Sequence, residues 1–507
     1  LLMLEFNIEM SDSNIIAAIK NYQTKNGKIT HISPTEFIAK NEQKWLFNDN
    51  GEFNTQMYKI LLFKEISNHI KAGTLNLKFS DKYKSIDDYL IGYNRWKLDK
   101  KELLDRANIN HLCDMESALL LLKENVAEHY KKTNENIITN EYLKFSKDNR
   151  PRVTTPKLSE STSHFVHEII GENIYIPLTK ILSDINFSTN YTSSFLHYSR
   201  KSSKDSPAEN IIYAAIIALG CNIGVRKMGK ISTGVGADKL EYVVRWFFSK
   251  DNIDEANRMV LDIVEKLSLP KIYLQKKDSL HTSSDGQKFN VTVPSINATH
   301  SFKYFGTGKG VSAYSFIDEK SKLVYNSVIS ASEREAGYIL DGLLHNKDIE
   351  SDMHSTDTHG YSEVIFGVCN SLGILFAPRI KNYNDQLLYT FKEVPRNIYE
   401  NKGYKILPSK SMYIDESMIS DQWENILRLL CSIKLGETKA SIILKRLSSY
   451  AKQHPLHKAI KEIGRIHKTI FLLRYFDETH LRQNIEKQLN KIELSHLFAK
   501  AVFFGNN

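Results

Sequence analysis

Residues 281–291 read HTSSDGQKFNV and place an aspartate and a glycine between two stretches that the residue pattern predicts as strand. Asp-Gly is a strong signal for a two-residue hairpin turn, so the segment taken alone favours a turn at Asp285. The alternative is that Asp285 is a carboxylate held on a strand for chemistry. The choice between them depends on partner residues elsewhere in the chain.

Short runs rich in β-branched and aromatic residues surround this segment, with turn residues between them, and such runs predict strands. Two helices and a last strand are expected after them, at 333–346, 361–373 and 374–380. Strands followed by alternating helix and strand indicate a mixed α/β sheet. The five expected strands before the first of these helices are 271–275, 288–293, 300–306, 311–318 and 322–330.

The chain has 507 residues, a length that suggests about three domains. Apolar periodicity predicts helices before residue 271 and again from residue 422 to the end. Residues 133–162 lose this periodicity and gain Asn, Thr and Pro, which indicates a linker or an arm that follows DNA. The sequence opens without an initiator Met and stops just after a strong helix, so we expect the central part of a longer protein.

Positive charge is concentrated in two stretches. The formal net charge is +9, and residues 434–500 hold 14 Lys and Arg against 6 Asp and Glu. Residues 131–157 hold 7 Lys and Arg against 3 acids. Clustered positive charge with interleaved Tyr and Phe is typical of a protein that binds a phosphate backbone. The alternative is a solvated helix surface.

Cysteines and apolar runs exclude several classes of protein. Cys113, Cys221, Cys369 and Cys431 form no CxxC pair, which argues against a zinc ribbon or a disulfide framework and for a reducing compartment. The longest apolar run, at 211–224, is shorter than the roughly 18–20 residues that span a bilayer. We therefore expect a cytoplasmic protein without a membrane segment.

Two further acids have informative neighbours. Asp357, in HSTDTHG, lies near the end of a short expected strand and before a helix, where it would also suit an N-cap. Glu493 follows Leu481, Ile485 and Leu489 at steps of four, so it continues an apolar stripe. A carboxylate on such a stripe needs a cation, a hydrogen-bond donor or a metal ion. A structural salt bridge with a nearby Lys or Arg is the alternative for Glu493.

The three acids together form a specific pattern. Asp357 lies 72 residues after Asp285, and Glu493 lies 136 residues after Asp357. Two aspartates on neighbouring strands and one glutamate on a later helix can converge at one edge of a sheet. Their hard oxygen ligands suit Mg²⁺ or Mn²⁺. Two such ions about 4 Å apart hold the attacking and leaving oxygens of an in-line phosphoryl transfer.

Histidines near Asp357 offer a rival site. His345, His354 and His359 would form a transition-metal hydrolase site with that carboxylate. Their spacing matches no HExxH helix or comparable motif. We expect these histidines to face phosphate or solvent instead.

Several long blocks resemble, in order, the C-terminal half of the replicative transposases of the Tn-three family. The resemblance runs from about residue 200 to the end, and more loosely through KAGTLNLKFSDKYKSIDDYLI at 71–91. Long blocks in the same order are far more specific than three scattered acids. The blocks are ALGCNIGVRKMG, SSDGQKF, LDGLLHN, DMHSTDTHGYSEVIFGVCNSLGILFAPRI, ILRLLCSIKLGETKASIILKRLSSY, EIGRIHKTIFLLRYF and QLNKIELSHLFAKAVFF.

The resemblance implies an RNase H-like α/β catalytic domain with a DDE triad and a helical insertion, preceded by mostly helical domains. By motif, the triad falls on Asp285 in SSDG, Asp357 in TDT and Glu493 in LNKIE. Ile492 stands where the family more often has Gly, which leaves the glutamate in place. The expected regions are 1–132, helical and DNA-binding or dimerising; 133–162, the linker or arm; 163–270, a helical linker domain; 271–380, the catalytic core; 381–475, the insertion; and 476–507, the acid-bearing helix that completes the core.

The resemblance also implies a DDE transposase that cuts one strand at each transposon end and joins the exposed 3′-OH to target DNA. Two Mg²⁺ or Mn²⁺ ions at the triad, terminal inverted repeats as the DNA partner, a homodimer, and replicative movement through a cointegrate belong to the same expectation. Two alternatives stay open. One is a non-enzymatic DNA-binding remnant, and the other is an RNase H-like, structure-selective nuclease.

Seven residues are candidates for DNA contact, and for the four in the insertion the alternative is a solvated surface cation. The basic helices of the insertion would hold DNA through its phosphates and carry little information about sequence. Arg379, at a strand end, is expected to approach the phosphate that is cut. Asn490 and Lys491 flank Glu493 and are expected to contact the cut strand. The candidates in the insertion are Lys434, Arg446, Arg465 and Lys468.

Overall fold

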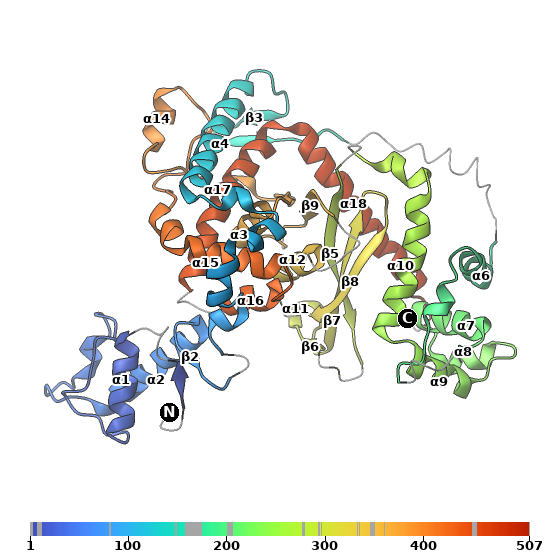
Figure 1. Cartoon of the computed structure of the whole chain (residues 1–507). Coiled ribbons are helices and arrows are strands. Elements are labelled where there is room, and N and C mark those ends of the chain that lie inside the picture. Colours follow the sequence, from blue (N-terminus) through green and yellow to red (C-terminus); the bar gives the residue numbers. More distant parts are fainter. Residues whose placement is uncertain are drawn as a thin grey trace. The chain divides into compact units, whose positions relative to one another are not determined.

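The computed structural model divides into two compact units (Figure 1). Unit 1 comprises Leu1–Thr155 and Glu333–Arg482, and unit 2 comprises Pro156–Ser332 and Gln483–Asn507. These units divide the expected 271–380 region between them, and the boundaries of the expected functional regions stay a prediction. The described residues are 4–7, 13–80, 83–147, 150–157, 175–199, 206–275, 279–292, 295, 297–331, 333, 335–344, 350–358, 360–448 and 454–505.

Helices dominate the first part of unit 1, as expected from the sequence. Asn54 caps helix α2 (Thr55–Ala72) by accepting the backbone N–H of Met57 at 2.9 Å. Gly73 ends that helix at a φ of 76°, which favours glycine. The elements are β1 (Phe6–Asn7), α1 (Ser13–Thr24), η1 (Gln43–Leu46), α2 (Thr55–Ala72), β2 (Asn76–Leu77), η2 (Ile86–Tyr89), α3 (Tyr93–Arg106), η3 (Asn110–Leu112), α4 (Met115–Asn136), β3 (Leu143–Phe145) and β4 (Pro151–Val153).

The second part of unit 1 is built around a close crossing of two helices, α13 and α17. A Cβ on Gly464 would overlap the carbonyl oxygen of Glu363, and a Cβ on Gly367 would lie 2.7 Å from the carbonyl oxygen of Ile460. These glycines let the backbones approach. The elements are α12 (Ala336–Leu344), β9 (Met353–Thr356), α13 (Glu363–Ser371), β10 (Leu375–Phe376), η6 (Tyr383–Asp385), α14 (Arg396–Asn401), α15 (Glu416–Lys434), α16 (Ala440–Leu447), α17 (Pro455–Asp477) and the start of α18 (Thr479–Val502).

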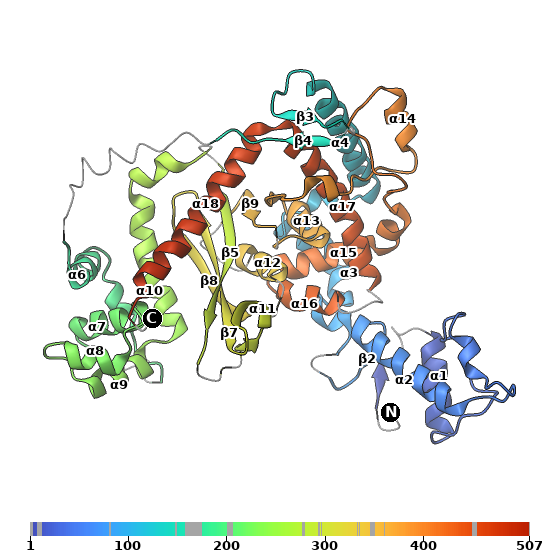
Figure 2. The ribbon, with the colours of Figure 1, turned by 180° about the vertical axis from the view of Figure 1, so that it is seen from behind.

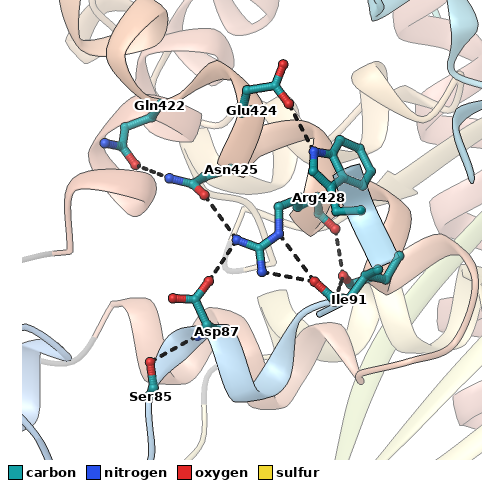
Figure 3. Close-up of polar contacts among 9 residues, drawn as sticks. Ser85, Asp87, Ile91, Gln422, Glu424, Asn425 and Arg428 are labelled. Atoms are coloured by element: carbon teal, nitrogen blue, oxygen red, sulfur yellow. Dashed lines mark hydrogen bonds and ion pairs between the residues drawn. The ribbon is translucent and has the colours of Figure 1, made fainter. Parts of the chain in front are cut away.

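The helices of the expected insertion pack against the N-terminal helices within unit 1. Arg428 of α15 is 1% exposed and donates to Asp87 Oδ1 at 2.7 Å and to the carbonyl oxygen of Ile91 at 2.9 Å (Figure 3). Thr133 of α4 donates to the carbonyl oxygen of Leu473 in α17 at 3.2 Å. Because buried polar groups need partners, these bonds tie the insertion to the N-terminal helices.

Unit 2 begins with a helical part, as expected for residues 163–270. Its core contains Ile212 and Ala215 of α7 and Leu240 and Val243 of α9, all buried. Figure 2 shows these helices gathered beside α10. The elements are α6 (Leu178–Thr189), η4 (Tyr191–Ser194), α7 (Glu209–Gly220), α8 (Val225–Ile231), α9 (Ala237–Phe247), α10 (Lys250–Lys266) and η5 (Leu269–Tyr273).

The rest of unit 2 is an antiparallel sheet with α18 beside it, in both Figure 1 and Figure 2. β7 pairs with β5 on one side and with β8 on the other, in register from Thr282 with Asp318 to Asn290 with Gly310 along β5. The elements are β5 (His281–Asn290), β6 (Thr299–His300), α11 (Phe302–Phe305), β7 (Lys309–Asp318), β8 (Leu323–Ser330) and α18 from Gln483 onward.

Two expected strands are wrong. The expected strand 271–275 falls largely in η5, where Pro270 occupies the first turn and suits a helical start. The expected strand 300–306 contains the short helix α11, which Gly306 ends at a φ of 58°. Aromatic residues favoured a strand at both places. The backbone preferences of Pro270 and Gly306 outweighed them.

Candidate active site

Asp285 lies in the middle of β5 and not in a turn. It pairs with Ser315 of β7, and the next residue, Gly286, pairs with Tyr314. Asp285 Oδ1 accepts the backbone N–H of Gly286 at 2.8 Å. The hairpin interpretation of this Asp-Gly pair is therefore wrong, because the continuous ladder with β7 outweighs the local preference for a turn.

Helix α18 lies against the face of β5 that carries this carboxylate. Ser283, Asp285 and Gln287 share that face because side chains alternate along a strand. Ser283 donates to the carbonyl oxygen of Gln488 at 3.2 Å, and Gln287 donates to the carbonyl oxygen of His496 at 3.3 Å. Asp285 Oδ2 lies 3.4 Å from His496 Nδ1. Two turns of α18 thus bracket the carboxylate.

Glu493 lies one helical turn before His496, between the two contacts of α18 with β5. Residues three apart share one side of a helix, so Glu493 belongs to the part of α18 that passes Asp285. Its side chain is exposed. The apolar stripe continues from Leu489 to Ile492, which is fully buried, and does not include Glu493. The sequence argument assumed that Glu493 is buried on the apolar stripe, and this assumption is wrong. Glu493 nevertheless belongs to the part of α18 that passes β5, the strand of Asp285.

His496 is a neighbour of the candidate site that the sequence did not single out. Its ring contacts Asp285, and its Nε2 is buried without a hydrogen-bond partner among the described residues. The available signal was its position three residues after Glu493, on the same side of the helix. No periodicity distinguishes such a histidine from an ordinary core residue.

A row of polar side chains leads from Asp285 across the sheet. Ser315 is the direct neighbour of Asp285 on β7, and Asn326 is the neighbour of Ser315 on β8. Ser315 donates to Asn326 Oδ1 at 2.7 Å, and Asn326 is exposed. The carboxylate therefore lies on a polar, solvent-accessible part of the sheet face.

The two residues before Ile492 have different surroundings. Asn490 is exposed, as its predicted role in DNA contact requires. Lys491 Nζ donates to the carbonyl oxygen of Glu319 and lies 5.0 Å from the ring centroid of Tyr273. Burial, with Lys487 nearby, lowers the pKa of Lys491 to about 8. Lys491 therefore anchors α18 within unit 2, and its contact to the cut strand stays a prediction.

Asp357, in unit 1, directly follows β9. Its Oδ1 accepts the backbone N–H of Gly360 at 3.1 Å, which holds the carboxylate in a tight loop. Ser362, and not Asp357, caps α13, by accepting the backbone N–H of Ile365 at 3.4 Å. The N-cap interpretation of Asp357 is wrong.

Arg379 is placed beside the loop of Asp357. Its backbone N–H donates to the carbonyl oxygen of Thr356 at 2.9 Å, and Thr358 donates to the carbonyl oxygen of Arg379 at 3.3 Å. The side chain of Arg379 is half-buried. Arg379 therefore lies beside the loop of Asp357, the carboxylate that directly follows β9.

The rival histidine site has no support in the described part of the chain. His354 is fully buried, with its ring stacked 6.4 Å from that of Phe376. His345 and His359 lie outside the described residues. His354 is therefore part of the core of unit 1, and its prediction as a residue facing phosphate or solvent is wrong.

The cations predicted in the insertion are mostly engaged within unit 1. Arg446 is 6% exposed and donates to the carbonyl oxygens of Ile70 and Lys71 at 2.8 and 2.9 Å. This burial contradicts the prediction of Arg446 as a phosphate contact. Lys434 of α15 is half-buried, and its prediction is not tested.

Two further cations of the insertion surround one carboxylate. Arg465 and Lys468 of α17 lie 3.5 and 3.9 Å from Glu363, and Arg465 also pairs with Glu462. Lys468 is 8% exposed, and burial lowers its pKa. We correct Lys468 to a structural residue, and the charge of Arg465 is largely balanced by its two glutamates.

The donor atoms of the candidate site are carboxylate oxygens, which is the chemistry that hard divalent ions prefer. Asp285 and Asp357 are half-buried and Glu493 is exposed, so their oxygens are accessible to an ion. Among the described residues, no three His, Cys, Asp or Glu side chains are already gathered as a metal site. The residue types fit such an ion.

A family model of the Tn3 transposase DDE domain matches residues 180–507. This chain belongs to that family. Asp285, Asp357 and Glu493 all lie within the matched residues. A DDE domain of the Tn3 transposases implies the use of a divalent metal ion.

Several transposases of this family are similar to the chain over nearly its whole length. The transposase for transposon Tn1546 of Enterococcus faecium is 30% identical over 99% of the chain and 50% of its own length. The transposases for Tn2501 of Escherichia coli and Tn501 of Pseudomonas aeruginosa are 28% and 27% identical, over 95% and 99% of the chain. The chain spans about half the length of these curated relatives.

One sequence prediction concerns membranes. Among the described helices, none is both long and apolar enough to cross a bilayer.

Proposed function

We propose that the protein is a DDE transposase that hydrolyses one DNA strand at each transposon end and joins the freed 3′-OH to target DNA. The observation that carries the proposal is the position of Asp285 in the middle of β5, facing the part of α18 that bears Glu493. A strand-borne carboxylate under a helix-borne one is what the catalytic core of this family requires. We assign the third acid to Asp357, which directly follows β9 and lies in the TDT motif that resembles the family's second aspartate.

The order of elements supports an RNase H-like core. The three long strands β5, β7 and β8, with the short elements β6 and α11 between β5 and β7, are followed by α12, β9, α13 and β10. The acid-bearing helix α18 comes after the insertion. This order matches the fold that the resemblance implies, with the first acid on the first strand and the second at the end of β9. The helical insertion separates the last acid from the rest of the core.

The three carboxylates would hold Mg²⁺ or Mn²⁺, in our proposal two ions. When bound, such ions lower the pKa of the attacking hydroxyl group and stabilise the charge that develops at the phosphorus centre. Asp285 and Asp357 would bind through oxygens that strand positions fix, and Glu493 through an exposed side chain on α18. His496 would restrain Asp285 through their contact.

The chain's own cations and amides would position the DNA. Arg379, beside the loop of Asp357, would contact the phosphate that is cut, since guanidinium groups bind phosphate oxygens in pairs. Exposed Asn490, one turn before Glu493 on α18, would contact the strand that is cut. Lys434 of α15 would contact a phosphate farther along the DNA.

We further propose the partners and the outcome of the reaction. The substrate would be double-stranded DNA with terminal inverted repeats, cut at both ends by a homodimer in the bacterial cytoplasm, where the DNA lies. Strand transfer without double-strand excision would produce a cointegrate, which makes the movement replicative.

A cleavage assay on a supercoiled plasmid that carries the element's own two ends tests this proposal. With Mg²⁺ or Mn²⁺, the protein should nick the plasmid at the ends and then join a pre-cleaved 3′ end to target DNA. Asp285→Asn and Asp357→Asn should each abolish both steps and leave binding of the ends intact.

Three outcomes would overturn the proposal. Cleavage by the Asp285→Asn protein at the wild-type rate would remove the carboxylate from the mechanism. Cleavage without joining of a pre-cleaved end would indicate a structure-selective nuclease, and binding without either step would indicate a non-enzymatic DNA-binding protein.

A further inference from the structure

The helices α8 and α9 of unit 2 line a basic pocket that the proposed chemistry does not use. Its volume is about 740 Å³, within the range of sites that hold small molecules. Its lining includes Arg226 and Lys227 of α8, and Arg245 and Glu241 of α9. The three cations are exposed, so the pocket presents net positive charge to solvent.

These cations are not neutralised by the protein. In the described part of the chain, neither Arg226, Lys227 nor Arg245 forms an ion pair with an Asp or Glu. Exposed lysines on the neighbouring helices do form such pairs, as Lys180 does with Asp184 at 2.6 Å. Unpaired cations around a hollow attract anions, and a phosphate group is the anion that several cations hold best.

A cluster of aromatic rings adjoins the pocket through Arg245. The guanidinium of Arg245 lies 5.6 Å from the ring centroid of Trp246. That ring lies 5.1 Å from His197 and 5.2 Å from Tyr198, at interplanar angles of 15° and 10°. Tyr198 is 56% exposed, which is unusual for a large ring in an ordered stack. Near-parallel rings with an exposed member form a surface on which a planar base can stack.

We propose that this pocket and ring cluster bind a single DNA strand, with phosphates at Arg226, Lys227 and Arg245 and an unpaired base against Tyr198. The combination of unpaired cations with exposed stacked rings favours a nucleic acid over an acidic peptide, because a peptide carboxylate needs no stacking surface. The inference rests on the proposed function, since nicking and strand transfer supply unpaired strands.

The pocket is also connected to the helix that bears Glu493. The backbone N–H of Gly505, just beyond α18, donates to the carbonyl oxygen of Cys221 at 2.8 Å, and Lys227 Nζ donates to the carbonyl oxygen of Gly505 at 3.4 Å. A Cβ on Gly505 would lie 2.7 Å from that Cys221 oxygen, so the fit is tight. A strand held at Lys227 therefore lies beside the residues that fix the end of α18.

A binding experiment without divalent ions tests the site. The probes are a fluorescein-labelled single strand of about 20 nucleotides and the duplex of the same sequence, titrated at several salt concentrations. Replacing both pocket arginines, in Arg226→Ala/Arg245→Ala, should weaken single-strand binding at least tenfold. It should also lower the slope of log K against log salt by about 1.4, for two lost phosphate contacts.

The ring cluster has its own variant. Tyr198→Ala should weaken single-strand binding about tenfold, in the range for loss of one stacked base, and should leave duplex binding nearly unchanged. A strand that carries 5-iodouracil should crosslink to Tyr198 on irradiation. Peptide mapping of the crosslink by mass spectrometry then identifies the contact directly.

A charge-matched control separates the site from general electrostatics. Lys180→Ala/Lys250→Ala removes two exposed lysines of the same unit, which pair with Asp184 and Asp254 outside the pocket. Equal loss of binding in this variant and in the arginine variant would overturn the proposal. A crosslink that maps outside Tyr198 and its neighbours, or displacement of the strand by polyglutamate with no crosslink at all, would also overturn it.

Binding at the pocket can be separated from cleavage. The Asp285→Asn protein should bind the single strand at the pocket as the wild type does. If that variant cleaved DNA but the pocket variants still lost binding, the proposed active site would fail and the pocket would stand. Loss of cleavage in Asp285→Asn, together with unaltered binding in the pocket variants, would overturn the pocket and leave the proposed active site intact.

Discussion

The insertion and the α8–α9 pocket are both rich in positive charge, and they use it differently. In the insertion, Arg428 and Arg446 are almost fully buried and bond to the N-terminal part of unit 1. Figure 3 shows the bonds of Arg428. In the pocket, Arg226 and Arg245 are exposed and have no carboxylate partner among the described residues. A count of charges along the sequence ranks the insertion first as a DNA surface, and the burial of Arg428 and Arg446 removes these two cations from that count.

The difference follows from the cost of burying a cation. A buried guanidinium is retained only if its N–H donors are satisfied. Those donors are then already bonded to protein atoms and are not available to a phosphate. An exposed cation at the rim of a hollow costs little and stays available. Substitutions in the insertion should therefore change stability, and substitutions in the pocket should change binding.

The largest expected effect on stability is at Arg428. Replacing it by Met leaves Asp87 and the carbonyl oxygen of Ile91 without their donor, and should destabilise unit 1 by about 3 kcal/mol. Urea unfolding followed by circular dichroism measures this change. Unchanged stability with weakened DNA binding would place Arg428 at a DNA surface and remove the contrast with the pocket.

Acid should destabilise both units because each buries a neutral histidine. Burial lowers the pKa of His281 in β5 to about 3, with Lys491 contributing, and lowers that of His457 in α17 to about 4. The ordinary pKa is about 6.5, so the unfolded chain binds more protons below that pH. Stability should fall as the pH drops from 6.5 towards 4, by on the order of 3 kcal/mol for each histidine.

The measurement for these histidines is the urea midpoint at pH 7 and at pH 4.5, in the wild type and in His281→Gln and His457→Gln. Each variant should lose less stability on acidification than the wild type does. A wild type and variants with parallel pH profiles would show that neither histidine is buried in the neutral form.

The close crossing of α13 and α17 predicts a smaller loss of stability. Gly464→Ala introduces a Cβ that overlaps the carbonyl oxygen of Glu363, so α13 and α17 must separate. We expect a destabilisation of about 1–3 kcal/mol. Gly220→Ala, at a helical glycine of α7 with open space around its Cβ position, is the control for the same substitution without a close contact. Equal losses in the two variants would mean that the crossing is not close-packed.

The smallest expected effect on stability is at the pocket. Arg226→Ala/Arg245→Ala removes exposed side chains without ion pairs, so the free energy of unfolding should change by less than about 0.5 kcal/mol. The same variant is expected to lose single-strand binding at least tenfold. A large loss of stability would mean that these arginines are structural, as in the insertion.

Much of the fold was predictable from residue patterns. The strands at 311–318 and 322–330 and the helices at 333–346 and 361–373 all have counterparts in the structure. Apolar residues recur at a regular period within these segments, so the local sequence is enough to predict them. The short aromatic runs 271–275 and 300–306 were not predictable, because Pro270 and Gly306 decide their backbone and not their side-chain pattern.

The candidate site was predictable only in part. Asp285 pairs with Ser315 of β7, 30 residues away, and α18 covers β5 through contacts such as Ser283 with Gln488, 205 residues apart. No local sequence pattern contains either contact. The stripe that pointed to Glu493 was read one residue too far, because a helical stripe advances by three as often as by four. Burial of Arg446 and Lys468 depends on unit 1 as a whole, so charge alone could not reveal it.

The proposed chemistry requires that Glu493 and the two aspartates form one catalytic carboxylate set. The sharpest test compares Glu493→Gln with Glu486→Gln, two carboxylates two turns apart on α18, in the Mg²⁺-dependent nicking assay. We expect Glu493→Gln to lower the nicking rate more than about 100-fold and Glu486→Gln to leave it near the wild-type value. Equal rates for the two variants, with both proteins folded and bound to the ends, would exclude Glu493 from the catalytic set.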